Sequence, residues 1–116
     1  MNQEEFRLTA SDGVALFAQR WEPDQKPVGV ICLVHGLGEH SGRYDHLAQV
    51  LAQAGYATMA IDLRGHGLTP GKRGHVYSYQ RLLDDITLLL KKAQQRHPGV
   101  PLFLYGHSMG GGLVLN

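Results

Sequence analysis

Gly106-His107-Ser108-Met109-Gly110 follows the apolar run Leu102 to Tyr105 and precedes a second apolar run, Leu113 to Leu115. A Gly-x-Ser-x-Gly pattern between a strand and a helix is typical of a nucleophile elbow, a sharp turn that holds its serine in a strained backbone conformation. The two glycines remove the bulk that would keep the strand and the helix apart. The pattern makes Ser108 a candidate nucleophile. The Met109 N–H, at a helix start, becomes a candidate donor to an oxyanion.

Strands and helices are predicted to alternate ahead of this turn. A hairpin is expected over Glu5 to Thr9 and Val14 to Trp21, around Ser11-Asp12-Gly13. Apolar runs predict buried strands over Val28 to Val34, Tyr56 to Leu63 and Pro101 to Tyr105, and helical spacing predicts helices over Tyr44 to Ala54 and Tyr79 to His97. A hairpin followed by β-α-β-α-β-α indicates the α/β class, a parallel sheet with helices on both faces.

The two predicted helices differ in their charge pattern. The first has apolar residues at helical spacing (Leu47, Val50, Leu51 and Ala54) and is followed by Gly55, which suits a helix end. The second has acidic residues early and basic residues late, as the helix dipole favours. We interpret Asp84 and Asp85 of this helix as solvated residues near its start.

Composition excludes several classes of function. At 116 residues and 43% hydrophobic content, the chain holds one modest core, and its net charge of +1 offers no basic face for nucleic acid. The single cysteine, Cys32, lies in an apolar run and is expected to be a buried strand thiol. No pair of histidines has the spacing of a zinc motif, so we expect neither a metal nor a cofactor. A polar, acidic start and the absence of a membrane-length apolar run predict a cytoplasmic protein.

A second glycine-rich segment, His35-Gly36-Leu37-Gly38, follows the first predicted parallel strand. Hydrolases of this architecture place a second oxyanion-hole N–H after that strand, and we assign it to Leu37. The flanking glycines let the backbone turn its amide inward. By itself the segment is equally consistent with a tight turn that only needs glycine. The elbow that follows a neighbouring strand strengthens the oxyanion-hole interpretation.

Four segments carry a family resemblance: His35-Gly36-Leu37-Gly38-Glu39-His40-Ser41-Gly42-Arg43-Tyr44, Asp62-Leu63-Arg64-Gly65-His66-Gly67, Gly71-Lys72-Arg73-Gly74-His75-Val76 and the elbow. Together they resemble the monoacylglycerol lipase and lysophospholipase branch of the α/β-hydrolase family, over nearly the whole chain. The resemblance implies an α/β-hydrolase fold in which residues 1–116 are the N-terminal part of a single domain, incomplete after the elbow. It implies that Ser108 is the nucleophile and that Leu37 and Met109 provide the oxyanion-hole amides. The implied substrate is a small lipid ester, with peripheral membrane contact through a lid that follows the elbow in relatives.

The catalytic triad of this fold is not complete in the sequence. Its acid and histidine follow the serine, and none of the eight residues after Ser108 is acidic or histidine. His66, His75 and His107 are the candidates for a substitute base, but we interpret all seven histidines as structural or surface residues. Asp62 is expected to fix the loop after its strand through its carboxylate. We therefore expect a truncated, inactive piece of a serine hydrolase.

Two alternatives remain at this stage. The chain is a non-catalytic half-domain that needs a partner chain, or it binds a dinucleotide. Gly36-x-Gly38-x-x-x-Gly42 follows a strand and Asp62 comes about 20 residues later, which imitates a dinucleotide-binding fingerprint. The third glycine is displaced, however, and this interpretation leaves the elbow unexplained.

Overall fold

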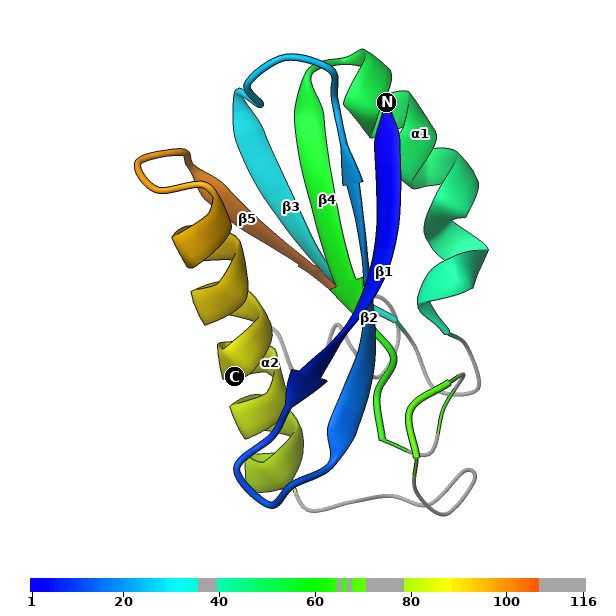
Figure 1. Ribbon diagram of the computed structural model, residues 1–116, viewed down its shortest axis with the longest axis vertical. Helices are drawn as coiled ribbons and strands as arrows, with labels where there is room; N and C mark the ends of the chain where they lie inside the picture. Colours follow the sequence, from blue (N-terminus) through cyan, green and yellow to red (C-terminus); the bar gives the residue numbers. More distant parts are fainter. Residues whose placement is uncertain (36–39, 65, 67, 71–78, 107–116) are drawn as a thin grey trace.

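The first predicted buried strand forms β3 (Gly29–Val34), which pairs in parallel with a strand on each side. The computed structural model describes residues 1–35, 40–64, 66, 68–70 and 79–106. Within them, β3 lies between β4 (Tyr56–Ile61) and β5 (Leu102–Gly106) (Figure 1). All three predicted parallel strands are confirmed, with ends that differ by one or two residues.

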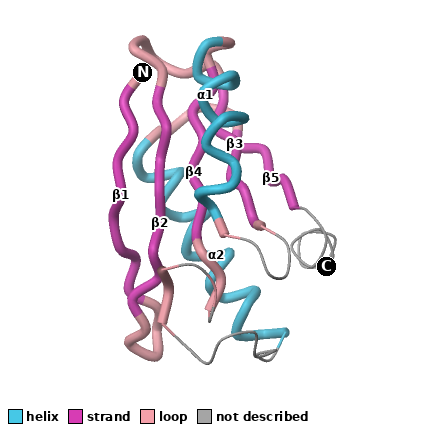
Figure 2. Tube along the Cα trace, turned by 90° about the vertical axis from the view of Figure 1, so that its right-hand side faces the viewer, coloured by secondary structure: helices cyan, strands magenta, loops and turns pink. Residues whose placement is uncertain are grey.

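The predicted hairpin is also confirmed. Its first strand is longer than the sequence pattern indicates, and its second has the predicted length but is shifted by one residue. β1 (Asn2–Thr9) and β2 (Ala15–Glu22) pair antiparallel along their whole length. Gly13, at the turn between them, has a φ of 88°, a left-handed conformation that favours glycine. β2 also pairs antiparallel with β4, so the sheet is mixed and has the order β1-β2-β4-β3-β5 (Figure 2).

Among the described residues, one helix covers each face of the sheet (Figure 1). A 3-10 turn, η1 (Ser41–Tyr44), leads into α1 (Asp45–Gln53), and α2 (Tyr79–Arg96) lies on the opposite face. The apolar side chains of α2 pack with alternate residues of β3 and β4: Leu82, Ile86, Leu89 and Ala93 against Val30, Cys32, Val34, Ala57, Met59 and Ile61. A smaller cluster under α1 contains Trp21, Leu33, Ala48 and Ala60. Cys32 is buried, as predicted.

The buried side of α1 is not the predicted one. Leu47 and Val50 are 40% and 47% exposed, whereas the buried residues of the helix are Ala48 and Ala52. Small alanine side chains let the helix axis approach the sheet closely, and the larger apolar side chains are left at its edges. The predicted helix end is correct, because Gly55 follows α1 with a φ of 94°.

Candidate active site

The three parallel strands end together at one edge of the sheet. Val34, the last residue of β3, pairs with Ile61 of β4 and with Gly106 of β5. In the sequence, Leu37 comes three residues after Val34, and Ser108 comes two residues after Gly106. Open α/β sheets bind their ligands at the carboxyl ends of their strands. The segments that contain Leu37 and Ser108 therefore begin at neighbouring strand ends.

The residues predicted to carry the chemistry lie outside the described part of the chain. These are Leu37, Ser108 and Met109, together with His75 and His107, two of the histidines considered as a substitute base. Their roles stay predictions. Other residues that follow β3 and β4 are described, and their contacts hold the described parts of these loops.

Asp62 ties these loops to the sheet. Its Oδ1 accepts a 2.6 Å hydrogen bond from the Ser41 backbone N–H, and its Oδ2 accepts a 2.9 Å bond from the Leu68 N–H. Its own N–H donates to the Phe17 carbonyl on β2. The predicted role of Asp62 in fixing the loop after β4 is thus confirmed. The carboxylate also holds η1, a contact across 21 residues that the sequence pattern did not indicate.

Thr69 makes a second link between the same loop and β2. Its hydroxyl donates a 2.6 Å hydrogen bond to the Asp62 carbonyl and accepts a 2.8 Å bond from the Phe17 N–H. Thr69 is fully buried. Because buried polar groups are costly unless bonded, these two contacts favour one position of the chain after β4.

Two buried histidines, His35 after β3 and His66 after β4, lie against each other with ring centroids 5.2 Å apart. The Leu63 N–H donates a 2.8 Å hydrogen bond to His35 Nε2, so the ring proton of His35 is on Nδ1. His66 Nδ1 donates to the Arg64 carbonyl at 2.9 Å. Its Nε2 is buried with no hydrogen-bond partner among the described residues. Both rings thus support the loop backbone, as the structural interpretation of the histidines predicts.

The buried Arg64 forms an ion-pair network with one buried and one partly exposed carboxylate. Its Nε and Nη2 donate to the Asp85 carboxylate on α2 at 2.6 and 3.0 Å. Its Nη1 and Nη2 donate to the Asp12 carboxylate in the hairpin turn at 2.7 and 2.9 Å. One guanidinium therefore joins the loop after β4 to α2 and to the β1–β2 turn.

The prediction that Asp85 is solvated is wrong. It is 1% exposed, and Arg64 is 3% exposed. A signal was present in the sequence, because position 85 comes three residues after Leu82 and four before Leu89, on the apolar side of α2. An acidic residue on that side needs a buried cation, and Arg64 supplies it.

The pKa values of the two carboxylates in the network are shifted in opposite directions. Hydrogen bonding from Arg64 lowers the pKa of Asp12 to about 2. Burial raises the pKa of Asp85, because the loss of solvent there outweighs the attraction of the same guanidinium. The two carboxylates together raise the pKa of Arg64, which keeps it charged.

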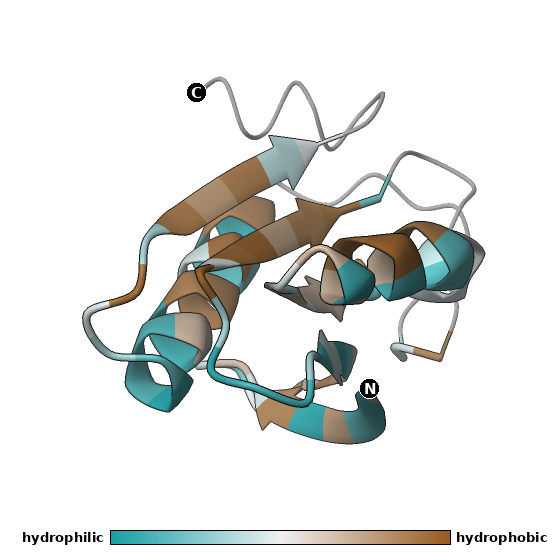
Figure 3. Ribbon diagram, turned by 90° about the horizontal axis from the view of Figure 1, so that it is seen from above, coloured by the Kyte–Doolittle hydropathy of each residue, from teal (hydrophilic) through white to brown (hydrophobic). Residues whose placement is uncertain are grey.

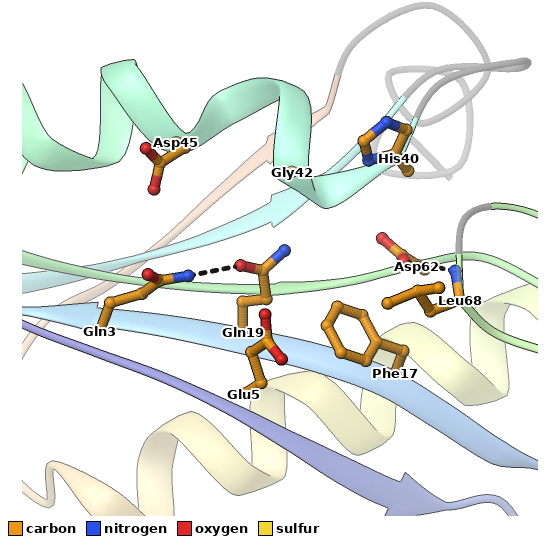
Figure 4. A pocket seen from close by; sticks show the side chains of 9 residues that line it. All are labelled: Gln3, Glu5, Phe17, Gln19, His40, Gly42, Asp45, Asp62 and Leu68. Carbon is orange, nitrogen blue, oxygen red and sulfur yellow. Dashed lines mark hydrogen bonds between the residues drawn. The ribbon is translucent and has the colours of Figure 1, made fainter.

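A cavity of about 630 Å³ lies on the α1 side, between the hairpin and η1 (Figure 4). Its lining residues are Gln3, Glu5, Phe17, Gln19, His40, Gly42, Asp45, Asp62 and Leu68. Gln3 donates to Gln19, which in turn donates to the Ser41 hydroxyl. The two glutamine side chains of this wall are thus held in place by hydrogen bonds.

Within the described ranges, no three histidine, cysteine or acidic side chains come together as a metal site would require. None of the helices in these ranges combines the length and apolar character needed to cross a bilayer.

Known proteins match this chain in sequence and in structure. The serine aminopeptidase S33 family profile matches residues 25–116. A monoacylglycerol lipase of Mycolicibacterium smegmatis is 41% identical over 112 residues, which cover 97% of this chain and 40% of that protein. A monoglyceride lipase of Rattus norvegicus is 42% identical over 108 residues, 93% of this chain and 36% of that protein. A soluble variant of the Saccharomyces cerevisiae monoglyceride lipase, solved with a substrate analogue, superposes with a TM-score of 0.86 and 31% identity, over all of this chain and 38% of that one.

Proposed function

Because the chain belongs to the serine aminopeptidase S33 family of α/β-hydrolases, we propose that it carries the nucleophile and oxyanion hole of a serine hydrolase for lipid esters. The family resemblance and the fold class inferred from the sequence are confirmed. The chain spans 36% to 40% of the length of the monoglyceride lipases described above, so the activity of a complete enzyme belongs to this proposal. The proposed substrates are carboxylic esters of lipid-like alcohols, either monoacylglycerols or lysophospholipids.

The proposed reaction passes through an ester of Ser108. The serine hydroxyl attacks the ester carbonyl, the bond from carbon to the leaving oxygen breaks, and the alcohol departs. A histidine takes the hydroxyl proton and returns it to that alcohol, and an acid orients the histidine. Water then releases the fatty acid by the reverse sequence. The N–H groups of Leu37 and Met109 stabilise the oxyanion, a contribution of about 3 kcal/mol for one such donor.

The register of the strand ends is the observation that carries this proposal. An oxyanion hole needs two N–H groups within hydrogen-bond reach of one oxygen, so its two segments must leave the sheet side by side. Val34 and Gly106 are paired neighbours, and they directly precede the segments that contain Leu37 and Ser108. Asp62 holds η1, just after the first of these segments, through a 2.6 Å bond to Ser41. These contacts support the pairing of Leu37 with Met109.

Dinucleotide binding is less well supported. In that role Asp62 would present its carboxylate to a ribose hydroxyl. Both carboxylate oxygens instead accept backbone N–H groups, and the residue is almost completely buried. The remaining alternative is a half-domain that requires a partner chain. It agrees with the same strand register and Asp62 contacts, and it differs from the main proposal only in which chain completes the site.

Labelling by a fluorophosphonate tests the proposed nucleophile. We expect the complete gene product to form a covalent adduct on the peptide that contains Ser108, detected by mass spectrometry. Ser108→Ala should abolish the adduct, whereas Ser41→Ala should leave it, because the Ser41 hydroxyl is buried and accepts a hydrogen bond from Gln19. An adduct on another residue would contradict the assignment.

A further inference from the structure

Gln19 is a buried polar residue in the middle of β2, with only 6% of its surface exposed. Phe17 and Trp21, which share its face of the strand, are buried as well. Apolar residues predominate along β3 and β5 of the same sheet, as the colouring of Figure 3 shows. Because a buried amide is costly unless it is hydrogen-bonded, the Gln19 side chain needs partners at this position.

The Gln19 amide has a partner for its nitrogen and one for its oxygen. Its Nε2 donates a 2.9 Å hydrogen bond to Ser41 Oγ in η1, and its Oε1 accepts a 2.8 Å bond from Gln3 Nε2 on β1. Figure 4 shows the Gln19 side chain reaching from β2 toward η1, with Gln3 beside it. The buried bond to Ser41 joins two residues that are 22 positions apart in the sequence.

Ser41 is therefore held by two different parts of the chain. Its backbone N–H donates a 2.6 Å hydrogen bond to Asp62 Oδ1, and its hydroxyl accepts the bond from Gln19. Ser41 is fully buried, so water does not compete for either bond. With the bond to Asp62 alone, the Ser41 backbone could still turn about a single donor. The bond from Gln19 gives a second fixed point and sets the orientation of the start of η1.

The chain is also fixed a few residues earlier, at the end of β3. His35 is fully buried, and its Nε2 accepts a 2.8 Å hydrogen bond from the Leu63 N–H. In the sequence, Leu37 comes two residues after His35 and four before Ser41. A segment of a few residues between two fixed points has few conformations available. The position of Ser41 therefore restricts where the Leu37 N–H can lie.

We propose that Gln19 is a positioning residue of the oxyanion hole, and that it acts through the Ser41 hydroxyl to hold the Leu37 N–H in place. The inference rests on the proposed function, because it uses the role given there to Leu37. An oxyanion forms only in the transition state, so a misplaced donor slows the chemical step and leaves substrate binding nearly unchanged. Loss of the Gln19 bond should therefore lower kcat and not raise KM.

Gln3 and Gln19 provide a matched pair of variants. Gln19→Met and Gln3→Met make the same chemical change on neighbouring strands, and only Gln19→Met removes the bond to Ser41. In the complete gene product, assayed with a p-nitrophenyl ester, we expect Gln19→Met to lower kcat by about tenfold to a hundredfold with KM changed by less than about twofold. Gln3→Met should change neither quantity by more than about twofold.

Ser41→Ala removes the same bond from its other side and deletes one oxygen atom, so it carries the test if Gln19→Met fails to fold. It should lower kcat to a similar extent, and its Ser108 adduct with a fluorophosphonate should still form, but more slowly. Because Gln19 acts through the Ser41 hydroxyl, the double variant should have a kcat within about twofold of that of Ser41→Ala. Thermal melting of each variant shows whether it is folded.

Hydrogen exchange tests the position of the segment without any turnover. In a Ser108→Ala background, Gln19→Met should speed the exchange of the amides of residues 37–41, and Gln3→Met should not. If Ser108 of the wild type fails to label while this difference is seen, the proposed function alone is rejected.

Four results would overturn the role of Gln19. They are an equal loss of kcat in Gln19→Met and Gln3→Met, a rise in KM with kcat unchanged, additive losses in the double variant, and unchanged exchange of these amides in Gln19→Met.

Discussion

Arg64 and Asp85 form an ion pair in the interior of the protein, with 2.6 Å between the Arg64 Nε and the Asp85 Oδ2. The first residue lies in the loop after β4 and the second on α2. The same guanidinium reaches Asp12 in the hairpin turn. The network therefore holds three distant parts of the chain together.

Loss of the Arg64 charge should destabilise the fold strongly. Arg64→Met leaves Asp85 buried without its cation, which costs about 3–5 kcal/mol for a pair of this kind. Folded domains have only about 5–15 kcal/mol of stability, so we expect this variant to be largely unfolded. Arg64→Met combined with Asp85→Leu should recover part of the loss, because neither charge then remains buried. Urea denaturation of the wild type, the single variants Arg64→Met and Asp85→Leu, and the double variant measures the coupling. A wild-type midpoint for Arg64→Met alone would contradict the prediction.

Asp12 should make the fold sensitive to acid. Its folded-state pKa of about 2 is below the ordinary value of 3.8, so its contribution to stability is present above about pH 4 and is lost as the pH falls from 4 to 2. Asp85 acts in the opposite sense, because burial raises its folded-state pKa above the ordinary value, so Asp85 does not add to the loss of stability as the pH falls. Glu22, whose pKa is lowered by its hydrogen bond from Arg96, adds a second acid-sensitive contribution.

Thermal unfolding between pH 2 and pH 6 checks this prediction. Asp12→Asn should flatten the fall in melting temperature below pH 4 without abolishing it, since Glu22 remains. Asp84→Asn is the control, because Asp84 is exposed and accepts a hydrogen bond from Gln80 of its own helix. An Asp12→Asn profile parallel to that of the wild type would show that the carboxylate has no such role.

Cys32 should react with thiol reagents only when the protein opens. The side chain is fully buried in β3, and burial raises its pKa to about 12. Alkylation requires the thiolate and access to it, so at pH 8 we expect labelling at least ~100-fold slower than in denaturant. Iodoacetamide labelling followed by mass spectrometry measures both rates. Equal rates would mean that β3 is not packed in solution.

The sequence predicted the strands well because burial on both faces leaves continuous apolar runs, as in Val30 to Val34. It also predicted the hairpin and the end of α1, where Gly13 and Gly55 have the positive φ values that these positions need. Such features depend on neighbours in the chain. The spacing of apolar residues identified an apolar side of α1. In the structure, however, Ala48 and Ala52 pack closely against the sheet, and Val50 is exposed.

The supporting contacts of the site depend on residues far apart in the sequence. Asp62 and Ser41 are 21 residues apart, and Arg64 and Asp12 are 52 apart. The periodicity of apolar residues along the sequence does not identify such long-range pairs. The position of Asp85 on the apolar side of α2 indicates that a cation is needed, but it does not identify Arg64 as that cation. The roles of Ser108, Leu37 and Met109 rest on the motif and its resemblance, and stay predictions.

A polypeptide of residues 1–116 alone should turn over esters very slowly and should associate into heterogeneous particles. Without a positioned base Ser108 is a weak nucleophile, and loss of triad members lowers turnover by about 10⁴-fold or more. Phe103 and Tyr105 expose apolar surface next to the open edge of β5, an arrangement that promotes open-ended association. A p-nitrophenyl ester assay of the wild type and Ser108→Ala, with size-exclusion chromatography of both, provides the measurement. A monomer that melts cooperatively and loses its turnover in Ser108→Ala would contradict both expectations, and His66 or His75 would then be the base to substitute next.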